Sequence, residues 1–222
     1  MGARRQRKAR RGRWFLLALL AVAVTITAVI LGLRPGTTAE RPVTPASKPS
    51  PTALRNVDLS ALPIPRAPFC DAVDDKFLVA ALDGPVTRTQ HYDSGSRAQL
   101  TPAVKDIAHE YNCTWAAASG ASARAWVFAE PVRPAEARAL ARDRVRAGGC
   151  EPAAGGPKFG SPSVTVACRA GDGTTTVTLS GLFGDAWFSC QLTRPDAGTT
   201  SQALRLTARW CVHVAATLGA RP

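Results

Sequence analysis

The pattern of apolar and polar positions divides the chain into three stretches of different character. Residues 14–33 form a run of twenty uncharged, mostly apolar positions. Residues 34–68 contain eight prolines, separated mainly by small and polar residues. From residue 69 onward, apolar residues alternate with polar ones or recur at helical spacing in a series of short segments. The pattern predicts a membrane span, an extended spacer and a globular domain, in that order.

Within residues 69–222 the periodicity predicts a mixed domain of helices and strands. The predicted helices are 71–82, 102–110, 134–147 and 200–219, and the predicted strands are 111–118, 124–130, 163–169, 174–181 and 185–192. In strand 174–181 polar residues alternate with apolar ones, so we expect one of its faces to be exposed to water. The predicted fold class is α+β, an antiparallel sheet of about five strands with helices packed on one face.

The apolar run at 14–33 predicts a transmembrane helix, because about 20 apolar residues in a helix cross the hydrocarbon layer. The thirteen residues before it hold seven Arg or Lys, and such a tail stays on the cytoplasmic side. We therefore expect residues 1–13 in the cytoplasm and everything after residue 33 outside it. The alternative is a cleaved signal peptide, with a mature chain that starts near Glu40.

The proline-rich residues 34–68 predict an extracytoplasmic stalk. Proline favours extended conformers, which span about 3 Å per residue. The globular domain is then expected to occupy residues 69–222, a length that can bury a core of its own.

Six cysteines occur, and all of them lie in the predicted domain: Cys70, Cys113, Cys150, Cys168, Cys190 and Cys211. An even number of cysteines in an exported region, without the close spacing of zinc ligands, predicts a disulfide framework.

The pattern around the cysteines narrows the pairing. Cys211 lies on the apolar face of helix 200–219, and Cys190 shares a face with the apolar residues of strand 185–192, so we expect these two to pair. Cys150 follows a predicted helix, and Cys168 lies on the apolar face of strand 163–169, which predicts a second pair. Cys70 and Cys113 remain as the third pair.

Two short motifs carry a family resemblance. Cys70-Asp71 at the start of a helix, followed by Asn112-Cys113-Thr114-Trp115 at the start of a strand, resembles actinobacterial exported lipoproteins and membrane-anchored envelope proteins of unknown function. The resemblance covers residues 69–115 and the general order of elements. It implies a first disulfide between Cys70 and Cys113, an extracytoplasmic domain and no catalytic residues to carry over. This chain differs from the lipoproteins in having an apolar span in place of a lipidated cysteine.

The formal net charge of +12 does not indicate a nucleic-acid ligand. Seven of the positive charges belong to the N-terminal tail, and subtracting them leaves +5 for residues 34–222. A basic tail beside a membrane span is explained by topology and by attraction to anionic lipid. Arginine outnumbers lysine 23 to 5, which is typical of a high-GC bacterial genome.

Candidate catalytic chemistry is sparse. The available bases are His91, His109 and His213, and none lies in a recognised nucleophile or zinc pattern. His213 shares a predicted helix face with arginines, which indicates solvated surface. Acidic residues at 71, 74 and 75 fall within one helical turn, where they favour the helix dipole over a calcium site. We expect no catalytic residue, no metal and no cofactor.

Two features indicate binding. Arg138, Arg142 and Arg146 recur every four residues along helix 134–147, with Arg133 and Arg144 nearby, and form a possible patch for phosphate-bearing anions. The alternative is a solvated face, balanced in part by nearby acids. The four tryptophans after residue 100 are expected in the core, although two of them on an open sheet face would form the floor of a groove for an apolar or glycan ligand.

The sequence therefore predicts a single-pass bacterial envelope protein with a non-catalytic extracytoplasmic binding domain. The expected partner is another envelope protein, a wall polymer or a lipid. The alternatives are an exported enzyme of the hydrolase class and a structural tether.

Overall fold

The computed structural model describes residues 54–101, 103–195 and 197–221, and every structural statement below refers to these. The predicted cytoplasmic tail, the predicted membrane span and residues 34–53 of the predicted stalk lie outside them. None of the helices in the described ranges is both long enough and apolar enough to cross a membrane.

The domain is built on one seven-stranded antiparallel sheet. Across the sheet the strands are β1 (Val86–Tyr92), β4 (Glu110–Ala117), β5 (Ser122–Phe128), β9 (Ala186–Arg194), β8 (Thr175–Phe183), β7 (Ser163–Arg169) and β6 (Cys150–Pro152). A separate hairpin of β2 (Arg97–Thr101) and β3 (Val104–Ile107) follows β1. The α+β class and the antiparallel sheet are confirmed, but the sheet has seven strands rather than about five.

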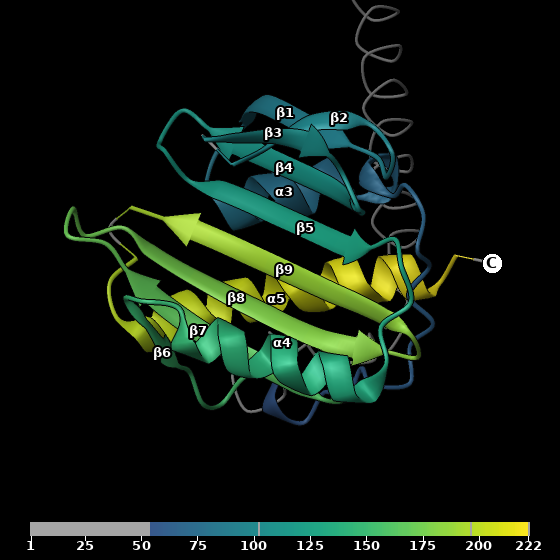
Figure 1. Cartoon of the computed structure of the whole chain (residues 1–222). Helices are drawn as coiled ribbons and strands as arrows, with labels where there is room; N and C mark the ends of the chain where they lie inside the picture. The colour runs from purple at the N-terminus through teal and green to yellow at the C-terminus, as the bar shows by residue number, and fades with distance from the viewer. Residues whose placement is uncertain (1–53, 102, 196, 222) are drawn as a thin grey trace, which may run out of the picture. The chain divides into compact units, whose positions relative to one another are not determined.

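Helices lie on both faces of the sheet (Figure 1). A short 3-10 turn, η1 (Cys70–Ala72), leads into α3 (Asp75–Leu82), which packs with α5 (Thr200–Gly219) against one face. The helix α4 (Pro134–Arg146) lies on the other face, over β6, β7 and β8. The prediction that all helices pack on one side is therefore wrong. The apolar side of α4 has its own partners, because Leu182 and Trp187 project from that second face.

Most of the predicted elements are present, with two corrections. The predicted helix at 102–110 is wrong, because its described residues, 103–110, contain strand β3 and the first residue of β4. Strand 174–181 corresponds to β8, but its polar face is not exposed to water as expected. Thr178 and Ser180 are buried on the face that α4 covers, and the Ser180 hydroxyl lies 2.8 Å from the Ser189 hydroxyl. Each hydroxyl there takes its hydrogen bond from its cross-strand neighbour instead of from water.

The main core lies between the sheet and the α3/α5 layer. Phe159 enters it from a loop and packs edge-to-face on Phe183, with 5.1 Å between ring centroids, and Phe188 lies 5.5 Å away. On the same side Trp115 of β4 meets Trp210 of α5 edge-to-face at 5.6 Å. The Trp115–Trp210 contact holds α5 against the sheet, and the phenylalanine contacts hold the loop at Phe159 there.

Three disulfides cross-link the domain. Cys70–Cys113 joins η1 to β4, Cys150–Cys168 joins β6 to β7, and Cys190–Cys211 joins β9 to α5. The pairing predicted from the sequence is confirmed, although Cys150 lies in a short strand rather than at a helix end. A domain with three disulfides fits an oxidising, extracytoplasmic compartment.

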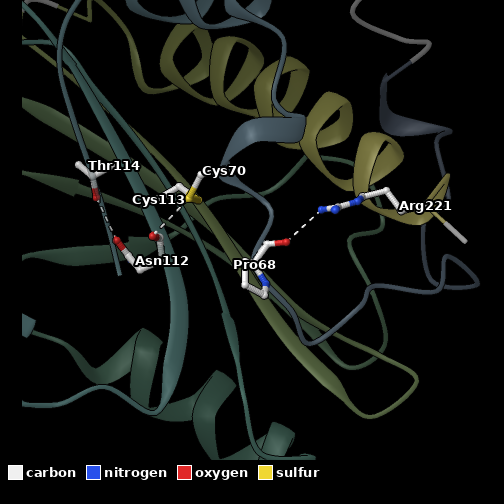
Figure 2. Close-up of a disulfide and its surroundings, with 6 residues drawn as sticks. All are labelled: Pro68, Cys70, Asn112, Cys113, Thr114 and Arg221. Carbon is white, nitrogen blue, oxygen red and sulfur yellow. Dashed lines mark hydrogen bonds between the residues drawn. A yellow bond between two sulfur atoms is a disulfide. The ribbon is translucent and has the colours of Figure 1, made fainter. Parts of the chain in front are cut away.

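The described end of the predicted stalk packs against the domain. Leu59 and Ile64 are buried in the main core. Asp58 forms an ion pair with Lys158 at 2.9 Å, and the Arg221 guanidinium donates to the Pro68 carbonyl at 3.0 Å (Figure 2). The folded unit therefore begins before residue 69.

Candidate functional site

A polar hollow lies on the α4 side of the sheet, where β1, β4 and β5 extend beyond the helix. It has a volume of about 1020 Å³, and the β2–β3 hairpin forms one of its walls. We call it the sheet hollow. The side chains of its floor are Gln90, Tyr92, Asn112, Thr114, Arg124 and Gln191.

Strand alternation and register place these side chains together. In β4, Cys113 and Trp115 point into the main core, so Asn112 and Thr114 point to the opposite face. Thr114 pairs with Gln90 of β1 on one side and with Arg124 of β5 on the other, and Arg124 pairs with Gln191 of β9. The result is one continuous cross-strand row from Gln90 to Gln191. It presents amide, hydroxyl and guanidinium groups to the hollow.

A charged network fixes one end of this floor. The Tyr92 hydroxyl donates to Glu110 Oε1 at 2.5 Å, and Arg124 Nη2 forms an ion pair with the same oxygen at 3.0 Å. The Arg124 guanidinium also lies 4.5 Å from the centre of the Trp126 ring, and that of Arg144 on α4 lies 5.6 Å from it. Burial, and then the charge of Arg124, lower the pKa of Arg144. Glu110 balances the charge of Arg124 and holds it in place.

The Tyr92 phenol gives this network a measurable signature. Burial, followed by the hydrogen bond to Glu110 and its negative charge, raises the pKa of Tyr92 from 10.0 to about 12. Below pH 10 the phenol is neutral in both folded and unfolded chains. Between pH 10 and about 12 the phenol ionises in the unfolded chain only. The contribution of Tyr92 to stability is therefore lost as the pH rises from 10 to about 12.

We expect an ultraviolet titration of the Tyr111→Phe variant to give a midpoint near pH 12, because Tyr92 is then the only tyrosine left in the chain. Adding Glu110→Gln should lower that midpoint, since the carboxylate charge is removed. A midpoint at the ordinary tyrosine value in the first variant would contradict the network.

Asn112 is the most enclosed residue of the floor. It is 3% exposed, and its Oδ1 accepts from the Thr114 hydroxyl at 3.2 Å (Figure 2). Its Nδ2 atom is buried and has no hydrogen-bond partner among the described residues. An unpaired buried amide donor costs about 1–3 kcal/mol, so Asn112 lowers the stability of the free domain.

The three histidines lie apart in the fold, and His91 lines the sheet hollow together with Ser96 and Thr114. His91 lies on β1 and His109 precedes β4, while His213 stacks on Phe77 with 3.3 Å between ring centroids. The prediction of a solvated His213 is corrected, because the ring is half-buried and burial lowers its pKa. Within the described ranges no histidine side chain forms a hydrogen bond or an ion pair.

The four tryptophans after residue 100 are buried, as expected, and the alternative of a groove floored by two of them is not formed. Trp115 and Trp210 lie in the main core, and Trp187 is buried beside α4. Trp126 faces the α4 side but is buried next to two guanidinium groups. The expectation that the tryptophans serve packing holds for all four in the domain.

The structure places Arg138, Arg142 and Arg146 on the exposed side of α4. Arg146 forms a long ion pair with Asp143 at 3.4 Å. Of the two neighbours expected to add to this patch, Arg133 pairs with Glu136 and Arg144 turns toward Trp126. The patch is therefore smaller than the sequence suggested.

Of the three acidic residues at 71, 74 and 75, Asp74 and Asp75 lie at the start of α3 and Asp71 lies in η1. The Asp74 carboxylate accepts from the Lys76 backbone N–H at 2.8 Å and so caps α3. In the parts of the chain that the structure describes, no cluster of three or more His, Cys, Asp or Glu side chains is placed to hold a metal ion.

No protein-family model matches this sequence, and no curated protein matches it. The interpretation of the sheet hollow therefore rests on its own geometry.

Sequence reasoning did not single out the sheet hollow. Its floor depends on β1 and on the register of four strands, and β1 was not predicted. The available signal was the alternation in β4, where polar Asn112 and Thr114 flank the core residue Cys113. Two polar residues that flank a core residue in a central strand indicate that the opposite face of the sheet carries a polar surface.

Proposed function

We propose that this chain is a single-pass bacterial envelope protein whose extracytoplasmic domain binds a polar, uncharged ligand in the sheet hollow and performs no reaction on it. The observation that carries the proposal is the cross-strand row from Gln90 to Gln191, which lines a hollow of about 1020 Å³. Small-molecule sites are commonly about 300–1000 Å³, with a few converging polar groups.

The lining favours a neutral ligand with many hydroxyl or amide groups. Amide and hydroxyl side chains both donate and accept hydrogen bonds. The charges around the hollow are balanced, because Arg124 pairs with Glu110 and the lining holds both Arg97 and Asp93. Outside a bacterial membrane, the sugar chains of the cell wall are ligands of this chemistry. We therefore propose a wall glycan as the ligand.

Co-sedimentation tests this proposal. The full chain in neutral detergent is mixed with actinobacterial wall sacculi from which the phosphate polymers have been stripped, and the bound fraction is measured. We expect the wild type to sediment with the sacculi. The Gln90→Ala, Thr114→Ala double variant should bind about tenfold more weakly, because two hydrogen bonds together contribute about 1–3 kcal/mol.

Two controls make the result specific. Thr89→Ala changes the next residue of β1, which faces the opposite side of the sheet, and it should bind like the wild type. The double charge reversal Arg138→Glu, Arg142→Glu tests the patch on α4. Loss of binding in this variant, with normal binding in the Gln90→Ala, Thr114→Ala variant, would transfer the site to α4 and overturn the proposal.

A further inference from the structure

A second hollow lies on the opposite side of the sheet, where the end of β9, the loop that follows it and the first turns of α5 meet. Its volume is about 500 Å³. Three arginines line it, Arg194, Arg205 and Arg209, together with Gly198, Gln202 and Leu206. We call it the arginine hollow.

The first of these arginines is held in place by the fold. The Arg194 side chain is only 19% exposed. Its Nη1 donates to the Ala81 carbonyl at 3.0 Å, and its Nη2 lies 3.3 Å from Asp83 Oδ2. Asp83 ends α3 in a left-handed conformation with a φ of 55°, and its carboxylate is 81% exposed. The guanidinium is thus positioned before any ligand arrives.

The other two arginines come from α5. Arg205 is half-buried and Arg209 is exposed, and they lie one helical turn apart on the same side of the helix. Like charges at this spacing destabilise a helix by about 0.2–0.5 kcal/mol, so the pair has a cost in the free domain. Among the described residues neither of them forms an ion pair, and Asp83 is the only acidic partner of Arg194.

We propose that the arginine hollow binds a phosphate group, as found in phosphodiesters. Guanidinium groups bind phosphate oxygens through paired, charge-assisted hydrogen bonds. Three of them around one small hollow, with Asp83 as the only carboxylate paired to them among the described residues, provide both the geometry and an excess of positive charge. Lipid head groups and soluble glycerol phosphate chains share this chemistry. The site is independent of the sheet hollow, which opens on the other face of the sheet.

Residue-resolved arginine modification tests the proposal on the full chain. The protein in neutral detergent micelles is treated with phenylglyoxal, and mass spectrometry gives the modification rate of each arginine. The probes are a soluble glycerol phosphate oligomer and phosphatidylglycerol added to the micelles. We expect either probe to slow modification of Arg205 and Arg209 several-fold, while Arg138 and Arg142 on α4 change little. The basic N-terminal tail does not affect this readout, because each residue is measured separately.

The two probes separate the sources of the phosphate. Protection by both supports a general phosphodiester site, and protection by phosphatidylglycerol alone supports a lipid head-group site. Protection by neither, or equal protection at Arg138 and Arg142, overturns the proposal. The acid nearest in sequence, Asp196, lies outside the described residues, so Asp196→Asn is measured as well. Protection that appears only in this variant would mean that the arginines are already neutralised, which also overturns the proposal.

A variant pair supplies a second readout. Arg205→Gln, Arg209→Gln should abolish the rise in thermal midpoint that the glycerol phosphate oligomer produces in the wild type. The matched control is Arg138→Gln, Arg142→Gln, which removes two exposed arginines at the same helical spacing and keeps the tail. The control should retain the shift. Equal loss in both variants would show attraction to net charge alone.

Discussion

Removing the Cys190–Cys211 disulfide by Cys190→Ala and Cys211→Ala is expected to lower the free energy of unfolding by about 4 kcal/mol. The bond closes a loop with a sequence separation of 21 residues. Closing a loop of this size reduces the conformational entropy of the unfolded chain, which stabilises the folded state by about 3 kcal/mol. Both sulfurs are also fully buried between β9 and α5, so their removal leaves a cavity that costs about another 1 kcal/mol. Urea unfolding of the full chain measures the change.

The Cys150–Cys168 bond is the matched comparison. Its sequence separation is 18 residues, so its effect on the unfolded chain is nearly the same. Both of these cysteines are only partly buried, at the β6 edge of the sheet. Replacing them with alanine should therefore cost about 3 kcal/mol, with little cavity contribution. If this variant is destabilised as much as the Cys190, Cys211 variant, burial does not contribute and the argument is wrong.

Gly181→Ala is expected to lower the free energy of unfolding by at least about 4 kcal/mol, or to prevent folding. Gly181 lies on the core side of β8, and the backbone of the loop at Phe159 crosses directly over it. An added Cβ would lie 1.7 Å from the Phe159 carbonyl oxygen and 2.8 Å from its carbonyl carbon. Both are backbone atoms, so the loop and the Phe159 ring would have to leave the core together.

Gly171→Ala is the control for this prediction. An added Cβ at Gly171, in the hairpin turn before β8, meets no atom within 4 Å. Its effect should stay within about 0.5 kcal/mol, as for most surface substitutions. Soluble yield and thermal unfolding of the two variants measure the difference. Similar behaviour of both would contradict the close crossing of Phe159 over β8.

The sequence predicted the elements whose two faces differ most. Helix α5 and strand β7 have the predicted bounds, because each has a clear apolar side that must be buried. The same reasoning paired the cysteines, since it identified which of them point to the core. Strand β1 was missed because it is a sheet edge with mostly exposed positions, so it carries no apolar alternation. Pro102 suggested a helix start, but the residues around it pair as a hairpin.

The sites depend on contacts that no local pattern contains. The floor of the sheet hollow joins Gln90 to Gln191, which become neighbours only through the registers of β4 and β5. The sequence also did not determine which face of the sheet α4 covers. The apolar residues of α4 required a partner, and the positions of Leu182 and Trp187 on the second face decided where that partner is.

The Cys70–Cys113 bond also bears on how the domain responds to mechanical force. A pull on the chain from the N-terminal side reaches the folded unit through residues 54–69. It would first detach Leu59 and Ile64 from the core, and then meet a covalent link into β4. Because β4 lies inside the sheet, between β1 and β5, tension arriving there is spread over two rows of backbone hydrogen bonds. Stretching would thus detach residues 54–69 from the domain and leave the sheet with its two hollows in place.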